Sequence, residues 1–242
     1  MPTSSNQPRR TLLLTGASRG IGHATVKRFS AAGWRVITCS RHPFPENCPW
    51  DAGPEDHIQV DLADEANTLE AVAEIRRRLD TRELHALVNN AAISPKAEAG
   101  QRLGSMDTTM DVWHHVFQVN FFAPIILARG LVDELKAAKG SVVNVTSIAG
   151  SRVHPFAGAA YATSKAALAS LTREMAADFG RLGLHRRGRA GTRSCGARTA
   201  PAGSAGPAGG RSGPRRSSAR TATKAGLSRH ACVQQQHAAA AA

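Results

Sequence analysis

The chain of 242 residues lacks long apolar runs, and no segment approaches the roughly 20 apolar residues that a membrane-spanning helix needs. Its first residues, MPTSSNQPRR, lack the order of basic residues, apolar core and small cleavage residues that marks a secretory signal. The four cysteines form no CxxC pair, so the sequence offers neither a zinc site nor a disulfide framework. These absences indicate a cytoplasmic protein that binds no membrane and no metal.

Acidic residues are absent from residues 185–242, although this segment carries ten arginines and one lysine. Residues 1–184 carry 20 basic and 18 acidic side chains, so most of the formal net charge of +13 arises from the later segment. That segment has only two large apolar residues, Leu227 and Val233. Such a composition cannot offset the roughly 1–2 kcal/mol per residue that ordering a backbone costs. We predict a domain over residues 1–184 and a disordered, low-complexity basic tail over residues 185–242.

Apolar runs alternate with helical patterns within residues 1–184. The predicted strands are 11–15, 34–40, 57–62, 84–90 and 140–147, and the predicted helices are 21–32, 64–79, 107–138 and 158–180. Four prolines within residues 41–56 predict a loop there. The alternation predicts an α/β domain with a doubly wound parallel sheet. Ligands of such sheets bind at the carboxyl ends of the strands.

A glycine-rich turn, TGASRGIG, follows the first predicted strand at residues 15–22. Its glycines permit a tight turn and let backbone N–H groups approach a pyrophosphate at a helix N-terminus. The spacing differs from GxGxxG, and such a motif in isolation can be no more than a turn. Its position between a strand and a helix favours a dinucleotide site.

Charged residues near the second predicted strand favour NADP(H) over NAD(H). An NAD site would use an acid at the end of this strand to bind the ribose hydroxyls. The strand instead ends Cys39-Ser40-Arg41, and Arg19 lies inside the glycine turn. Two guanidinium groups would suit a 2′-phosphate, which they can bind through paired hydrogen bonds. The alternative is that both arginines are solvated surface residues.

Polar residues also end the third and fourth predicted strands. Asp61 could accept a hydrogen bond from the adenine amino group, or it could be a turn residue before the next helix. The fourth strand ends Asn89-Asn90-Ala91-Ala92, where the amide groups can bridge strand ends and line a cofactor groove.

Tyr161 and Lys165 are four residues apart, which places them on one face of the last predicted helix. Tyrosine titrates near 10, and a nearby ammonium or an oxidised nicotinamide ring lowers that pKa. Tyr161 could then exchange a proton with a substrate oxygen near neutral pH. Ser147 ends the fifth predicted strand, where its hydroxyl could hold a carbonyl group.

Asn120 lies in the long predicted helix, four residues before Pro124. Because proline has no N–H group, the carbonyl of Asn120 loses its usual helical partner and could hold a water molecule near the site. A simple proline kink is the alternative.

Together these features resemble the classical short-chain dehydrogenase/reductase family over about residues 10–184. The resemblance rests on TGASRGIG, NNAA, Asn120, Ser147 and YATSK at residues 161–165, in the order and spacing of the family. NNAA departs from the usual NNAG by one methyl group. The resemblance implies a Rossmann-type fold and hydride transfer between NADP(H) and a carbonyl or secondary alcohol, as in 3-oxoacyl reductase-like members. It also implies a homodimer or homotetramer.

The resemblance assigns roles to the candidate residues. Tyr161 would be the acid/base, and Ser147 would polarise the substrate carbonyl. Lys165 would bind the nicotinamide ribose, lower the pKa of Tyr161 and connect to a water held by Asn120. The implied cofactor-binding residues are Gly16, Ser18, Arg19, Gly20, Ile21, Gly22, Ser40, Arg41, Asp61, Leu62, Asn89, Ala91, Tyr161 and Lys165.

The resemblance stops at about residue 185, where a family member would continue with a sixth strand, a substrate lid and a seventh strand. Residues 185–242 could be a product of a shifted reading frame, a low-complexity extension, or a basic arm that binds nucleic acid. Reading CGN arginine codons one base later permits Gly-Val-Ala-Val-x-Ala-Leu-Ala-Pro after His185, which is similar to the missing strand and turn. We expect an impaired reductase whose fifth strand is an unpaired edge. The alternatives are an inactive nucleotide-binding remnant and a basic-tailed nucleic-acid binder.

Overall fold

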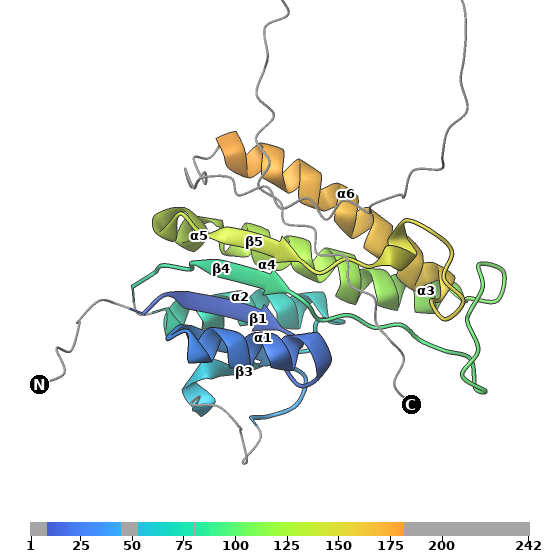
Figure 1. The fold of residues 1–242 in the computed structure, drawn as a ribbon, viewed down its shortest axis with the longest axis horizontal. Coiled ribbons are helices and arrows are strands. Elements are labelled where there is room, and N and C mark those ends of the chain that lie inside the picture. Colours follow the sequence, from blue (N-terminus) through green and yellow to red (C-terminus); the bar gives the residue numbers. More distant parts are fainter. Residues whose placement is uncertain (1–8, 45–52, 80, 182–242) are drawn as a thin grey trace, which may run out of the picture. The chain divides into compact units, whose positions relative to one another are not determined.

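The computed structural model describes residues 9–44, 53–79 and 81–181 (Figure 1). The predictions for the basic tail, and for half of the proline-containing loop before the third strand, fall outside these residues.

Five parallel strands form one sheet, as predicted, and their order is β3-β2-β1-β4-β5. They are β1 (Thr11–Thr15), β2 (Arg35–Ser40), β3 (His57–Gln59), β4 (Ala86–Asn89) and β5 (Ser141–Asn144). The chain first builds the sheet from β1 to β3, and it then returns to place β4 on the other side of β1. The carboxyl ends of β1 and β4 therefore flank the point where the strand order reverses, which is where ligands of such sheets bind.

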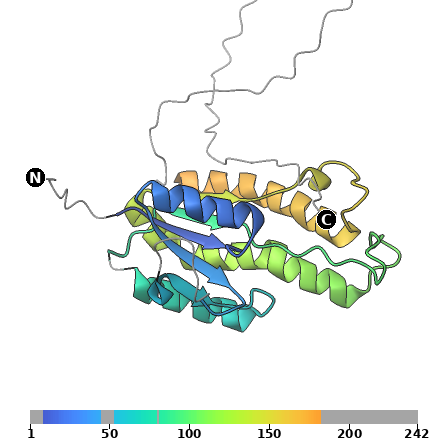
Figure 2. The same cartoon turned by 60° about the horizontal axis from the view of Figure 1, so that its bottom comes forward.

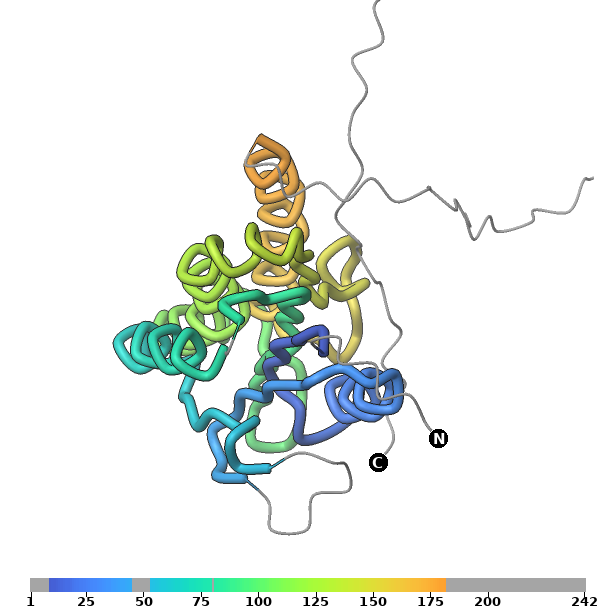
Figure 3. Tube along the Cα trace, turned by 90° about the vertical axis from the view of Figure 1, so that its left-hand side faces the viewer, coloured from blue at the N-terminus to red at the C-terminus, as the bar shows by residue number. Residues whose placement is uncertain are grey.

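Helices cover both faces of the sheet. They are α1 (Gly20–Ala31), α2 (Glu65–Arg78), α3 (Met110–Phe117), α4 (Ala123–Gly130), α5 (Val132–Ala138) and α6 (Ala159–Arg181), with short turns η1 (Pro54–Asp56) and η3 (Ile148–Gly150). Figures 2 and 3 show α1 and α2 on opposite sides of the strands. This arrangement is a Rossmann-type doubly wound sheet, and it explains why every residue of β1 is buried.

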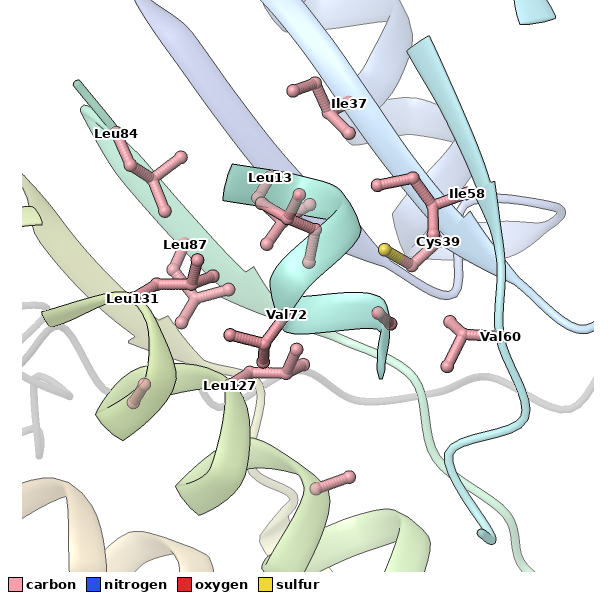
Figure 4. Packing of buried hydrophobic residues seen from close by; sticks show 14 of the residues in the cluster. Leu13, Ile37, Cys39, Ile58, Val60, Val72, Leu84, Leu87, Leu127 and Leu131 are labelled. Atoms are coloured by element: carbon pink, nitrogen blue, oxygen red, sulfur yellow. The ribbon is translucent and has the colours of Figure 1, made fainter. Parts of the chain in front are cut away.

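The larger hydrophobic core lies between the sheet and helices α2 and α4 (Figure 4). Leu13 and Leu87 extend from the central strands, Val72 from α2, and Leu127 from α4. Full burial of one such side chain contributes about 1.5–3 kcal/mol. A second cluster, which includes Leu12 and Leu14 of β1, packs against α1. The alternating side chains of β1 thus anchor both layers and fix the strand ends that carry the candidate site.

The helical region predicted over residues 107–138 is helical but interrupted. Residues Gln118–Phe122 (η2) form a π-helical turn between α3 and α4, and a break at Leu131 separates α4 from α5. The N–H of Ala123 donates to the carbonyl of Gln118, five residues back. Pro124 has no N–H to offer to Asn120, so the regular pattern cannot continue through this point.

No single helix among the described residues is long and apolar enough to cross a membrane. Met110–Gly130 and Val132–Ala138 together have the length and composition of a membrane span, but the two helices are bent by 60° at their break. Leu127 and Leu135 of this pair, and Leu131 at the break between its helices, lie in the core cluster against the sheet.

Candidate active site

The three glycines of the turn after β1 are required for different reasons. Gly16 has a φ of +69°, and a Cβ there would lie 2.8 Å from the Cα of Ala91. A Cβ on Gly22 would lie 2.0 Å from the carbonyl oxygen of Gly16. Gly20 has a φ of +57°, but a Cβ would meet no described atom within 4 Å. Gly16 and Gly22 therefore permit close packing within the protein, whereas Gly20 leaves the backbone at the start of α1 accessible to a ligand.

The glycine turn is fastened to the end of β4 by Asn90. The side-chain amide of Asn90 donates to the carbonyl oxygens of Thr15 (3.0 Å) and Gly16 (2.8 Å). In return, the hydroxyl of Thr15 accepts from the backbone N–H groups of Asn90 and Ala91, at 3.1 Å each. These four bonds join the two strand ends at the point where the strand order reverses.

The neighbouring Asn89 takes a different role. Its side chain is buried, and its amide donates to Asn144 Oδ1 of β5 at 2.8 Å. The amide of Asn144 in turn donates to Thr172 Oγ1 of α6 at 2.9 Å. Asn89 therefore bridges strands inside the protein, while Asn90 lines the groove. The alternation of side chains along a strand is the sequence signal that separates these two roles.

A cavity of about 440 Å³ opens at the carboxyl ends of β1, β2 and β4. It brings together eight of the predicted cofactor-binding residues: Gly16, Ser18, Arg19, Ser40, Arg41, Asp61, Leu62 and Ala91. It is also lined by His42 and His115, which belong to none of the sequence motifs. A second cavity, of about 640 Å³, lies over the aromatic outer face of α3 and includes no predicted site residue.

The cavity is basic at the end of β2. Arg19 and Arg41 both line it and are exposed, and no described carboxylate forms an ion pair with either. Asp61 is the one carboxylate among the described lining residues, and it follows β3 rather than β2. Its Oδ1 accepts from the N–H of Ala63 at 3.0 Å, which makes Asp61 a turn residue as well as part of the cavity wall.

Lys165 is the most strongly perturbed cation of the site. Only 2% of the residue is exposed, and its Nζ donates to the carbonyl of Val145 at 2.7 Å. Burial lowers the pKa of Lys165 from 10.5 to about 8, because the charged form loses its hydration. The same Nζ lies 6.0 Å from the centre of the Tyr161 ring, so α6 brings the predicted pair together on one face.

Ser147 is positioned by the turn that follows β5. It is the N-cap of η3, and its Oγ accepts from the N–H of Ala149 at 3.2 Å. That contact uses a lone pair, so the O–H of Ser147 remains available, and no described residue accepts from it. A hydroxyl in this state can donate to a carbonyl oxygen.

Asn120 is fully buried in the π-helical turn, and its side chain is already engaged. Its Nδ2 donates to the carbonyl of Ile93 and to Ser164 Oγ, both at 3.0 Å, and its Oδ1 accepts from the N–H of Ile93 at 2.8 Å. Ser164 precedes Lys165 and donates to the carbonyl of Tyr161 at 2.8 Å. The Asn120 side chain thus joins α6 to the segment after β4, which leaves its backbone carbonyl as the candidate holder of a water molecule.

Comparison with known proteins shows which family this chain is similar to. Residues 10–185 match the family model of the short chain dehydrogenases. The chain is 62% identical over 176 residues to Protein FixR of Bradyrhizobium diazoefficiens, an alignment that covers 72% of this chain and 63% of FixR. It is 33% identical over 177 residues to carbonyl reductase (NADPH) 2 of Sus scrofa, covering 69% of this chain and 65% of that protein. The chain thus spans just under two thirds of the length of these relatives.

The fold is also found among solved structures. One is an oxidoreductase of the short chain dehydrogenase/reductase family from Brucella ovis, in complex with a partially ordered NAD. It is 75% identical with a TM-score of 0.71, over 73% of this chain and 80% of that chain. The family match covers most of the chain and the same residues from which the resemblance was inferred. The chain therefore belongs to the short-chain dehydrogenase/reductase family of oxidoreductases.

Proposed function

We propose that this oxidoreductase uses NADP(H) and acts on a carbonyl or secondary alcohol. The observation that carries the cofactor preference is the basic end of β2, where Arg19 and Arg41 line the cavity without a described acidic partner. Two guanidinium groups can bind a phosphate dianion through charge-assisted hydrogen bonds, whereas the hydroxyls of an unphosphorylated ribose are usually bound by a carboxylate.

The named relatives support a nicotinamide dinucleotide but differ in its form. The carbonyl reductase of Sus scrofa is named for NADPH, and the structure from Brucella ovis holds a partially ordered NAD. The basic end of β2 favours NADP(H) in this chain, and a direct comparison of the two cofactors is the test.

The glycine turn fits the pyrophosphate of such a cofactor. The first N–H groups of α1 have no acceptor within the helix, and the positive end of the helix dipole favours an anion there. Gly20 carries no side chain that would cover these groups. When bound, the cofactor supplies the hydride chemistry, and the protein supplies orientation and electrostatics.

We assign the proton chemistry to Tyr161 and Lys165 of α6 and to Ser147, which precedes the turn η3 that packs against α6. Tyr161 exchanges a proton with the substrate oxygen, and the free O–H of Ser147 donates to that same oxygen. Lys165 holds positive charge beside the Tyr161 ring, which favours a phenolate during the exchange. The buried side chain of Asn120 keeps α6 in place against the segment after β4.

The tail bears on whether this chain turns over substrate. Residues 186–242 lie outside the family match, and residues 185–242 contain two large apolar side chains. We propose that residues with so few large apolar side chains add little to substrate binding, so turnover is weak and cofactor binding is the more direct readout. A chain that binds NADPH but reduces no carbonyl compound would favour the inactive remnant.

The proposed acid/base role of Tyr161 is tested by the variant Tyr161→Phe, which removes one hydroxyl and keeps the ring. We expect the variant to bind NADPH as the wild type does. Its rate of carbonyl reduction should fall by at least about 100-fold, as is typical of lost acid–base catalysis. The measurement is NADPH oxidation with a panel of ketones and aldehydes, together with NADPH fluorescence titration. Equal turnover by the variant and the wild type would overturn the assignment.

A further inference from the structure

A hydrogen-bonded set around His57 lies beside the basic end of β2. His57 begins β3 and pairs with Thr38 in the strand register. Its Nε2 lies 2.9 Å from the carbonyl oxygen of His42, and its Nδ1 lies 2.9 Å from Thr38 Oγ1. Because a carbonyl oxygen can only accept, Nε2 must carry the hydrogen of this bond.

The bond to His42 can exist in both protonation states of His57. In the neutral ring, Nδ1 accepts from the Thr38 hydroxyl. In the charged ring, Nδ1 donates to Thr38 Oγ1, and the Thr38 hydroxyl can turn to the carbonyl of Asp56 at 3.3 Å. The contact between His57 and the segment after β2 therefore does not depend on the charge of the ring.

A second side chain of β3 holds the preceding carbonyl. Gln59 lies two residues further along the strand, on the same face as His57, and its Nε2 donates to the carbonyl of Arg41 at 3.0 Å. The two consecutive carbonyls that follow β2 are thus held by two alternate side chains of β3. We refer to His57 and Gln59 as the β3 clamp.

Ser40 belongs to the same set. Its Oγ donates to the carbonyl of His42 at 3.0 Å, so its single hydroxyl hydrogen is already used. The Ser40 hydroxyl therefore strengthens the turn and is not a free donor for a phosphate. Arg41 keeps its guanidinium free of described partners while its backbone is held.

We propose that the β3 clamp positions Arg41 for the 2′-phosphate of NADP(H), and so sets cofactor selectivity from a strand that does not touch the phosphate. This inference rests on the proposed NADP(H) preference. Holding an arginine costs about 2 kcal/mol of side-chain freedom, and a mobile backbone would add to that cost. A fixed backbone at Arg41 reduces the conformational entropy that is lost when the phosphate binds.

The test is a set of dissociation constants for NADPH and NADH, measured by fluorescence titration of the full chain. His57→Leu and Gln59→Leu each remove one bond of the clamp, and Arg41→Ala removes the guanidinium. Each clamp variant should weaken NADPH binding about fivefold and leave NADH binding within about twofold, in line with the loss of one hydrogen bond. Gln101→Leu is the matched control, because Gln101 is exposed and lies outside the cavity.

The double variant His57→Leu/Arg41→Ala separates positioning from a general loss of structure. If His57 acts through Arg41, the double variant should bind NADPH no worse than Arg41→Ala, since interacting sites are not additive. Additive losses, or equal losses for NADPH and NADH in Gln59→Leu, would overturn the clamp. Gln59 is exposed, so this variant is expected to fold even if His57→Leu does not.

Arg41→Ala also tells the two proposals apart. If the wild type binds NADPH no more tightly than NADH, the proposed NADP(H) preference is wrong. If the wild type prefers NADPH but Arg41→Ala weakens both cofactors equally, Arg41 does not bind the 2′-phosphate, and the clamp is refuted while the preference stands. If Arg41→Ala is selective for NADPH but both clamp variants bind like the wild type, the preference stands and the clamp is refuted.

Discussion

Replacing Lys165 by methionine should change how the stability of the protein depends on pH. The wild-type side chain is buried, and burial lowers its pKa from 10.5 to about 8. At roughly 1.4 kcal/mol per pKa unit, burying the charge costs the folded protein about 3 kcal/mol when Lys165 is protonated in both states. Methionine has a similar length and no charge, so Lys165→Met removes this cost.

The sign of the pH effect follows from proton binding. Below pH about 8 Lys165 is charged in the folded and the unfolded protein, so the full cost is present. Between pH about 8 and 10.5 the folded protein releases the proton while the unfolded chain keeps it, and the free energy of unfolding of the wild type rises. From pH 7 to about 9.5, the wild type should gain about 2 kcal/mol relative to Lys165→Met.

The assay is urea unfolding of both proteins without cofactor at these two pH values, followed by tryptophan fluorescence. Comparing the two pH values removes any constant contribution, such as the lost bond to the carbonyl of Val145. Lys27→Met is the control, because Lys27 is exposed on α1 and the same substitution there removes no buried side chain. A difference between wild type and Lys165→Met that stays constant from pH 7 to about 9.5 would refute the buried charge.

Three further predictions concern packing near the site. Gly22→Ala would place a Cβ 2.0 Å from the carbonyl oxygen of Gly16, and we expect a loss of about 3 kcal/mol or more in urea unfolding; a variant as stable as the wild type would show that the turn can shift. Asn144→Leu leaves the buried polar side chains of Asn89 and Thr172 without this partner and should lower the free energy of unfolding by about 2–4 kcal/mol. A melting temperature equal to that of the wild type would contradict this prediction. Burial raises the pKa of Cys39 to about 12, so peptide mapping after iodoacetamide at pH 8 should find it unlabelled until the protein is unfolded.

The strands could be placed from sequence because their apolar runs are short and bounded by turns. The predicted strand 11–15 coincides with β1, where all five residues are buried between two helical layers. The predicted strand 57–62 is longer than β3, because β2 ends at Ser40, which pairs with Gln59. The length of a strand thus depends on its neighbour, which a local pattern does not contain.

The interruption of the long helix needed more than the presence of Pro124. A proline predicts a missing hydrogen bond, but a kink and a π-helical turn both satisfy that condition. The buried side chain of Asn120 bonds to Ile93 and Ser164, both distant in sequence, and these contacts accompany the wider turn. The outcome therefore depends on tertiary partners that no local window could show.

The candidate site divides in the same way. Gly16, Arg19, Arg41 and Asp61 belong to motifs at strand ends, and the structure brings them to one cavity. His57 belongs to no sequence motif, because its proposed role depends on a hydrogen bond to the carbonyl of His42 after the neighbouring strand. Contacts between neighbouring strands are a product of the fold, so residues of this kind appear only when the fold is known.

The most direct test of the proposed cofactor site is a titration of the purified full chain with NADPH and with NADH, followed by nicotinamide fluorescence. We predict saturable binding of NADPH with a dissociation constant at least about tenfold below that of NADH, which corresponds to about 1.4 kcal/mol from the 2′-phosphate contacts. Equal or tighter binding of NADH would contradict the role given to Arg19 and Arg41. Binding of neither cofactor would contradict a working dinucleotide site in this chain.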